Sequence, residues 1–150
     1  MELILWRHAE AEDGVPDSQR RLTTRGKKHA ARVAEWLLQR LPAKFSVIAS
    51  PTERTRQTAQ ALGVSFKTSD HLGPGASVES VLRAVDWPDR ERTVIVVGHQ
   101  PTLGRVAAFL VSGAPADWTV KKGALWWLTN RVRNDEAQVV VQAVISPDLL

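Results

Sequence analysis

Three short apolar segments each end in a polar motif, and this arrangement constrains the fold more than any other feature of the chain. The segments are residues 2–6, 46–49 and 93–97, and the motifs that follow them are Arg7-His8, Ser50-Pro51-Thr52-Glu53-Arg54-Thr55 and Gly98-His99. Continuous runs of valine, isoleucine and leucine predict parallel strands buried on both faces. Because ligands of open α/β sheets bind at the carboxyl ends of such strands, we expect the three motifs to meet in one pocket.

Helical patterns separate these strands. Apolar residues recur at helical spacing between residues 25 and 41, and Pro42 follows them. Ser50, with Pro51 at the first helical position and Glu53 completing a capping box, predicts a helix over residues 51–62. We further expect a short strand over 64–67, a helix over 78–85 that ends at Asp86-Trp87-Pro88-Asp89, and a helix that begins at Pro101.

The C-terminal part predicts a β-hairpin. Residues 124–129 and 137–145 have strand composition, and residues 130–136 have the composition of a turn. The resulting order βαβαβαβαββ predicts one domain over residues 1–150. We expect a three-layer α/β/α fold with a mainly parallel central sheet and an antiparallel C-terminal hairpin.

Composition excludes several classes of function. The absence of cysteine excludes disulfides, thiolate zinc sites and cysteine-nucleophile phosphatases, and it fits a reducing cytoplasm. No signal peptide or apolar segment of about 20 residues is present, so we expect a soluble protein without a membrane partner. The net charge is +4, but the basic residues are spread among 16 acidic ones without a basic run. This pattern argues against nucleic acid and fits an anionic substrate.

The motifs carry the residue types that phosphoryl transfer requires. A phosphoryl group spreads its charge over three oxygens, and the guanidinium groups of Arg7 and Arg54 can each bind two of them. His8 would attack phosphorus through one ring nitrogen while the other donates to an acceptor that fixes the tautomer. His99 would donate to a phosphoryl oxygen as an electrostatic clamp.

A metal site is the alternative interpretation of the same residues. His8, Glu10 and Glu12 alternate along the chain, and His99 could join them as a ligand. Arg7 and Arg54 would oppose a divalent cation at that point, so we favour the phosphate pocket. His29 and His71 have no convergent partners and are expected to be structural or solvated.

At these motifs the chain resembles the histidine phosphatase, or phosphoglycerate mutase-like, superfamily. The shared motifs are Leu5-Trp6-Arg7-His8-Ala9, Ser50-Pro51-x-x-Arg54-Thr55-x-Gln57-Thr58 and Gly98-His99. Small size and the segments at 17–26, 97–103 and 121–125 make it most similar to SixA-type phosphohistidine phosphatases. The resemblance implies that His8 is phosphorylated, that Arg7, Arg54 and His99 complete the phosphate pocket, and that Arg20 contacts substrate, although its neighbour Arg21 leaves that last assignment open. It implies no metal and no organic cofactor.

One departure from the family bears on the substrate. Relatives that act on phosphate esters place a general-acid glutamate after the third strand, where this chain has Leu72-Gly73-Pro74. An alkoxide leaving group needs that acid, whereas an imidazole can already carry its proton near neutral pH. We therefore expect a phosphohistidine phosphatase acting on a phosphorylated protein domain of a phosphorelay or phosphotransferase system.

Two other functions stay open from the sequence. A phosphomonoesterase for small esters would use Glu10, Glu12, Asp13 or Glu79 as its acid. A catalytically silent module would only bind phosphorylated partners.

Overall fold

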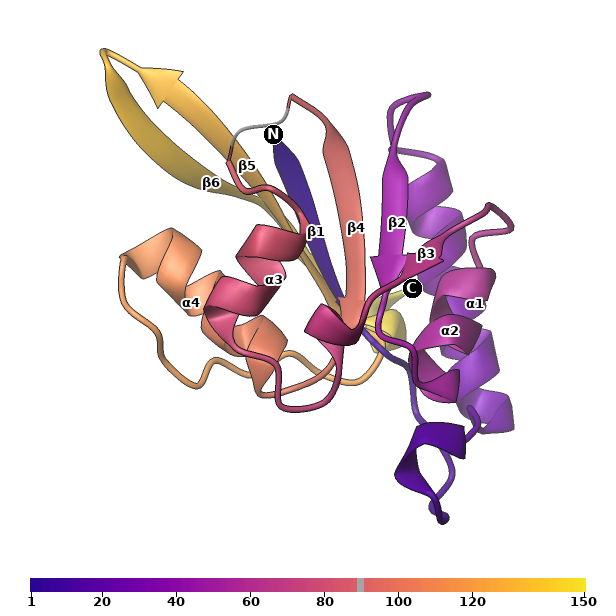
Figure 1. Ribbon diagram of the computed structural model, residues 1–150. Coiled ribbons are helices and arrows are strands. Elements are labelled where there is room, and N and C mark those ends of the chain that lie inside the picture. Colours follow the sequence, from indigo (N-terminus) through magenta and orange to yellow (C-terminus); the bar gives the residue numbers. More distant parts are fainter. Residues whose placement is uncertain (89–90) are drawn as a thin grey trace.

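The computed structural model describes residues 1–88 and 91–150, so Asp89 of the predicted helix end lies outside the described residues. In these described residues, six strands and four α-helices follow one another in the predicted order (Figure 1). The strands are β1 (Glu2–Arg7), β2 (Ser46–Ala49), β3 (Lys67–Thr68), β4 (Thr93–Gly98), β5 (Leu125–Arg133) and β6 (Glu136–Ile145). The helices are α1 (Thr24–Leu38), α2 (Glu53–Gln60), α3 (Val78–Ala84) and α4 (Thr102–Ser112).

The strands form one mixed sheet in the order β3-β2-β4-β1-β5-β6. Strands β1 to β4 are parallel to one another, with β4 between β1 and β2. The hairpin of β5 and β6 is antiparallel and pairs with β1. The predicted mainly parallel sheet with an antiparallel C-terminal hairpin is confirmed.

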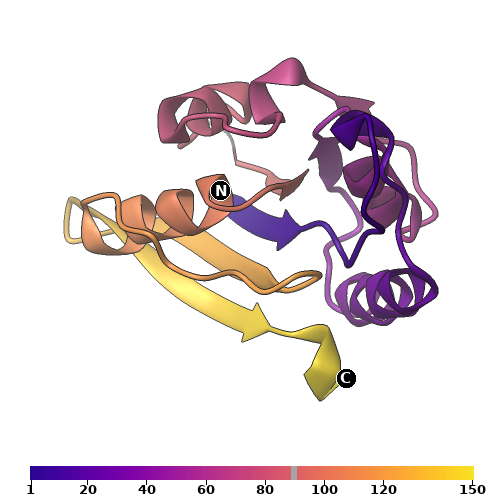
Figure 2. The same cartoon turned by 90° about the horizontal axis from the view of Figure 1, so that it is seen from below.

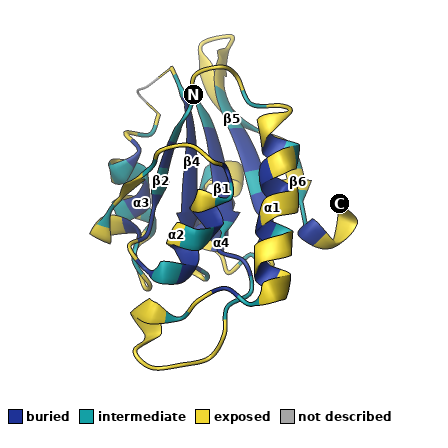
Figure 3. Ribbon diagram, turned by 90° about the vertical axis from the view of Figure 1, so that its right-hand side faces the viewer, coloured by how far each residue is buried: buried dark blue, intermediate teal, exposed yellow. Residues whose placement is uncertain are grey.

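Helices cover both faces of the sheet, because alternate strand residues point to opposite sides. Ile4 and Trp6 pack with apolar residues of α1 and α2, whereas Leu3 and Leu5 pack with those of α3 and α4. In Figure 2 the two helix pairs lie on opposite sides of the strands. Figure 3 shows the same division, with buried strands between helices whose outer faces are exposed. The three-layer architecture is therefore confirmed.

Several boundaries differ from the predictions, for local reasons. Helix α1 begins at Thr24 because the Thr23 hydroxyl accepts a hydrogen bond from the Gly26 amide, and it ends at Leu38, short of residue 41. The third strand occupies only Lys67–Thr68, both exposed, and not residues 64–67. Helix α4 begins one residue after Pro101. The hairpin turn shrinks to two residues, since Asn134 and Asp135 both adopt positive φ, which matches the twist of paired strands.

The predicted capping box of α2 is wrong. The N-cap is Thr52, whose side chain makes no capping hydrogen bond, and the helix begins at Glu53, so Pro51 lies outside it. The Ser50 hydroxyl lies instead 2.8 Å from Nε2 of His99. A contact across the sheet has replaced the local one.

The fold brings three strand ends to one edge. Strands β1, β2 and β4 run in the same direction and finish at Arg7, Ala49 and Gly98 (Figure 1). The loop that follows β1 passes below this edge before it enters α1. Within the described residues, no helix is long and apolar enough to cross a bilayer.

Candidate active site

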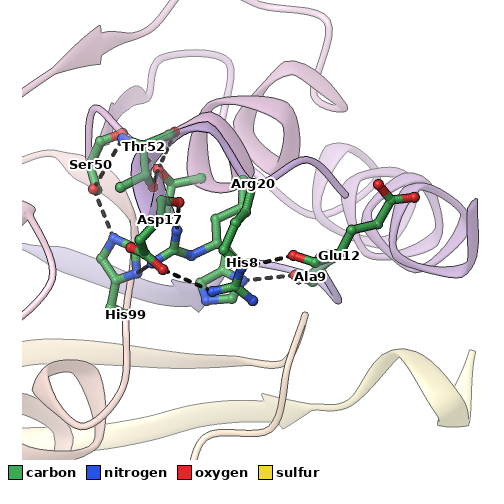
Figure 4. A network of polar contacts seen from close by, with 10 residues as sticks. His8, Ala9, Glu12, Asp17, Arg20, Ser50, Thr52 and His99 are labelled. Carbon is green, nitrogen blue, oxygen red and sulfur yellow. Dashed lines mark hydrogen bonds and ion pairs between the residues drawn. The ribbon is translucent and has the colours of Figure 1, made fainter. Parts of the chain in front are cut away.

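Backbone pairing holds the two motif histidines next to each other. The amide of His8 donates to the Gly98 carbonyl at 3.1 Å, and the amide of Ser50 donates to the Val97 carbonyl at 3.0 Å. The rings of His8 and His99 are consequently 5.4 Å apart between centroids. Arg54 comes from the first turn of α2, and its Nη2 lies 3.4 Å from Nδ1 of His99. The structure therefore brings His8, Arg54 and His99 together, and Figure 4 shows the two histidines side by side.

His8 has one free ring nitrogen. Its Nδ1 lies 2.8 Å from the carbonyl oxygen of Ala9, and a carbonyl can only accept, so Nδ1 carries the proton and Nε2 keeps a lone pair. The Ala9 amide in turn donates to the hydroxyl of Thr58 on α2 at 3.1 Å. Burial lowers the pKa of His8 to about 4, opposed by the Ala9 hydrogen bond and assisted by nearby arginines. The imidazole is therefore neutral near pH 7.

Asp17 holds Arg54 in place from the loop after β1. The Asp17 carbonyl accepts from Nη1 of Arg54 at 2.9 Å, and its carboxylate accepts from Nη2 at 3.1 Å. The same carboxylate accepts from Nη1 of Arg20 at 3.0 Å. These hydrogen bonds from Arg20 and Arg54 lower the pKa of Asp17. One ionised carboxylate thus joins two arginines at the mouth of the pocket.

Arg7 enters the pocket from the end of β1. Its Nη1 donates to the Val120 carbonyl at 2.9 Å, in the turn before β5. That turn is also tied to the site by the Gly123 amide, which donates to the His8 carbonyl at 3.0 Å. Gly123 has a φ of +75°, which favours glycine.

Two buried donors of the pocket lack partners. Within the described part of the chain, Nε of Arg7 and Nε of Arg54 are buried and make no hydrogen bond. Buried N–H groups nearly always have a hydrogen-bond acceptor in folded proteins, so these two guanidinium donors without one need an explanation. Donors of this kind fit an anion such as a phosphoryl group.

The loop position of Arg20 distinguishes it from Arg21. The Arg20 Nε donates to the Glu12 carbonyl at 2.8 Å, and this hydrogen bond directs the guanidinium towards Asp17. The positive charge of Arg20 also contributes to the lowered pKa of His8. Arg21 is exposed. The structure therefore brings Arg20 to the pocket.

His99 is buried, and burial together with the positive charge of Arg54 lowers its pKa to about 3. Its Nε2 contacts Ser50, and its Nδ1 lies 3.4 Å from Nη2 of Arg54. The nitrogen that faces the pocket is thus Nδ1.

The structure does not assemble the alternative metal site. Glu10 is bound by Arg25 and by the Thr23 hydroxyl at 2.9 Å. In Figure 4 the Glu12 carboxylate points away from His8 and His99. Among the described residues no group of three potential ligands forms. His29 is half-buried on α1, and His71 is exposed in the short helical turn 70–72, so neither reaches the pocket.

Sequence reasoning missed three residues of this site. Asp17 was noted only as part of a motif, Ser50 was assigned to a helix cap, and Thr58 had no predicted role. Their partners lie between 37 and 49 residues away in the chain. No periodic pattern carries such contacts, although all three residues lie within the shared motifs.

Comparisons with known proteins agree with this fold. The model of the histidine phosphatase superfamily (branch 1) matches residues 3–74. Phosphohistidine phosphatase SixA of Escherichia coli (strain K12) is 30% identical over 122 residues, which cover 75% of this chain and 76% of that protein. The uncharacterised protein Rv1276c of Mycobacterium tuberculosis (strain ATCC 25618 / H37Rv) is 34% identical over 121 residues, covering 76% and 75%. The structure of the protein histidine phosphatase SixA complexed with tungstate aligns with a TM-score of 0.84 at 26% identity and 99% coverage of both chains.

Fold, pocket and relatives together define a phosphatase, an enzyme of the hydrolase class. The chain belongs to the histidine phosphatase superfamily, and within it is similar to the SixA phosphohistidine phosphatases. The expected phosphoglycerate mutase-like fold is confirmed.

Proposed function

We propose that this protein removes the phosphoryl group from phosphohistidine on a partner protein, through a covalent phosphohistidine at His8. The observation that carries the proposal is the state of His8 in a cationic pocket. Its Nδ1 proton is held by Ala9, so Nε2 is left as a neutral nucleophile beside Arg54 and Arg7. The E. coli relative named as a phosphohistidine phosphatase supports the substrate class.

The first transfer forms a bond between Nε2 of His8 and phosphorus while the bond to the substrate imidazole breaks. Arg7 and Arg54 stabilise the charge on the phosphoryl oxygens, including through their unpaired Nε donors. Water then attacks phosphorus, and His8 leaves as the neutral Nδ1–H tautomer that Ala9 already stabilises. His8 therefore needs no separate acid to leave in the second step.

The carboxylates near the site favour phosphohistidine over phosphate esters. Asp17 lies in the pocket wall, but hydrogen bonds from Arg20 and Arg54 lower its pKa, so it is ionised and cannot donate a proton. Glu10 also has a lowered pKa, because Arg25 binds it. Glu79 is exposed on α3. An alkoxide leaving group would find no protonated acid in Asp17 or Glu10, whereas an imidazole that carries its own proton would not require one.

The test is a rate comparison in EDTA between a phosphohistidine-bearing protein, p-nitrophenyl phosphate and a phosphoserine peptide. We expect a large preference for phosphohistidine that His8→Ala abolishes, with His71→Ala as the matched control for an exposed histidine. EDTA should leave the rate unchanged. Hydrolysis of the esters at a comparable rate would refute the assignment, and loss of activity in EDTA would refute metal independence.

The partner follows from the same chemistry. A phosphorylated domain of a phosphorelay or a phosphotransferase system presents phosphohistidine on a protein surface, and we propose such a domain as the substrate. A relay domain phosphorylated on histidine can serve as the phosphoprotein in the rate comparison.

A further inference from the structure

Both ring nitrogens of His99 have fixed neighbours. Nε2 lies 2.8 Å from the Ser50 hydroxyl, and Nδ1 lies 3.4 Å from Nη2 of Arg54. His99 is only 4% exposed, so these contacts are shielded from solvent. These neighbours therefore determine which ring nitrogen carries the proton.

A guanidinium group has donors and no acceptor. The nitrogen of His99 that faces Arg54 must therefore present a lone pair, and the ring proton resides on Nε2, which donates to the Ser50 hydroxyl. Ser50 is fully buried and is itself fixed, since its amide donates to Val97 and its carbonyl accepts from the Thr55 hydroxyl at 2.7 Å. The hydroxyl is thus a rigid acceptor for the His99 proton.

This arrangement conflicts with a direct role for His99 as a donor. A phosphoryl oxygen that enters between Arg54 and His8 would meet the lone pair of Nδ1, and two acceptors repel each other. His99 can donate there only after Nδ1 gains a proton. Because Ser50 retains the proton on Nε2, the new proton must come from solvent.

We propose that Ser50 is a positioning residue that keeps the Nε2 proton of His99, so that binding of the phosphoryl group is coupled to uptake of one proton at Nδ1. The resulting imidazolium donates from Nε2 to Ser50 and from Nδ1 to a phosphoryl oxygen. The contact between Arg54 and Nδ1 is replaced, no bond to phosphorus changes, and the charge of His99 rises from zero to one. The inference rests on the proposed function only in that the pocket must accept a tetrahedral oxyanion.

The charges around His99 are consistent with a ring that takes up a proton only when an oxyanion binds. Arg54, His8 and Arg7 disfavour its protonated form, whereas Asp17 favours it. With burial as the largest cause, the pKa of His99 in the free protein is about 3. The imidazole is neutral near pH 7 until a second anion joins Asp17 beside it.

The first test is ¹⁵N NMR of protein labelled at histidine, with tungstate as the oxyanion. The chain has four histidines, and His8→Ala and His99→Gln assign the two rings of the pocket. We expect the free protein to show His99 with a proton on Nε2 alone, and the tungstate complex to show protons on both nitrogens. A neutral ring whose proton has moved from Nε2 to Nδ1 would overturn the proposal.

The second test is titration calorimetry with tungstate in two buffers of different ionisation enthalpy near pH 7, which counts the protons bound. Uptake close to one proton is expected in wild type and in His8→Ala, and no uptake in the double variant that also carries His99→Gln. Absent uptake in wild type, or uptake that persists in the double variant, contradicts the coupling. If tungstate does not bind the wild-type protein at all, the proposed phosphoryl pocket is refuted. If tungstate binds without proton uptake, only the coupling to His99 is refuted.

Ser50 itself is tested by substitution. Ser50→Ala should weaken tungstate binding about tenfold, the effect of one lost hydrogen bond, and should allow the proton of His99 to populate both nitrogens in the free protein. Ser50→Thr keeps the hydroxyl and should restore the single tautomer. An unchanged tautomer in Ser50→Ala would show that Ser50 does not position the proton, and the NMR result on wild type stands even if a variant fails to fold.

Discussion

Replacing Thr58 by valine should disturb His8, the proposed nucleophile, without contacting it. The Thr58 hydroxyl is fully buried, accepts from the Ala9 amide at 3.1 Å and donates to the Arg54 carbonyl at 2.8 Å. Valine has the same shape and no hydroxyl. Thr58→Val therefore removes the partner of the Ala9 amide and leaves a buried N–H unpaired.

The cost follows from these two hydrogen bonds. A buried N–H without a partner destabilises by about 1–3 kcal/mol. The bond to the Arg54 carbonyl adds little, because that carbonyl is an acceptor within helix α2. For a chain of this length, such a loss lowers the Tm by about 3–9 °C. If the hydrogen bond between the Ala9 carbonyl and Nδ1 of His8 is weakened by about 1 kcal/mol as a result, the rate of phosphoryl transfer falls about fivefold.

The assay combines thermal unfolding with single-turnover phosphorylation of His8 by a phosphohistidine-bearing protein. We expect a lower Tm and a lower rate of phosphoryl transfer, with substrate affinity nearly unchanged. Thr58→Ser keeps the hydroxyl and serves as the matched control. A Thr58→Val protein with the Tm and rate of wild type would refute the view that Thr58 supports His8 through Ala9.

Three further predictions follow from the structure. In the unfolded chain His8 binds a proton below its ordinary pKa of 6.5, whereas in the folded protein it does so only below about 4. The free energy of unfolding should therefore fall by on the order of 3 kcal/mol as the pH decreases through this window. Urea titrations in which His8→Ala leaves the pH dependence of this free energy unchanged would contradict the prediction. Arg20→Ala should lower kcat/KM for the phosphoprotein about fivefold to tenfold, whereas Arg21→Ala should leave it unchanged. Steady-state kinetics in which the two variants behave alike would show that Arg20 does not contribute to the site. Gly26→Ala would place a Cβ 2.1 Å from the Glu10 carbonyl oxygen and should cost about 1–3 kcal/mol, so an unchanged midpoint of chemical denaturation would argue against this close approach.

Local patterns predicted most of the fold because they report on burial. Residues 3–6 and 94–97 are continuously apolar, and both lie in strands covered on two faces. The errors fall where a local signal competed with a tertiary contact. The residues from Ser50 to Glu53 have the composition of a capping box, yet the Ser50 hydroxyl contacts His99 and the helix begins later.

The candidate site was predictable in its members but not in its internal contacts. Placing Arg7-His8, Arg54 and His99 at strand or helix ends was enough to predict that they converge. Asp17 could not be assigned in this way, because its role depends on a loop that brings its carboxylate to Arg20 and Arg54. A loop path has no periodic signature in sequence.

The amino-acid sequence by itself determined which segments are strands and helices, which edge of the sheet carries the polar motifs, and which side chains are able to bind a phosphoryl group. These properties depend on apolar spacing and on the chemistry of single residues. The tertiary structure alone decided the protonation pattern of His8 and His99. Whether a ring nitrogen carries a proton depends on whether its neighbour is a carbonyl, a hydroxyl or a guanidinium, and those neighbours, Ala9, Ser50 and Arg54, take their positions only when the sheet and α2 have assembled.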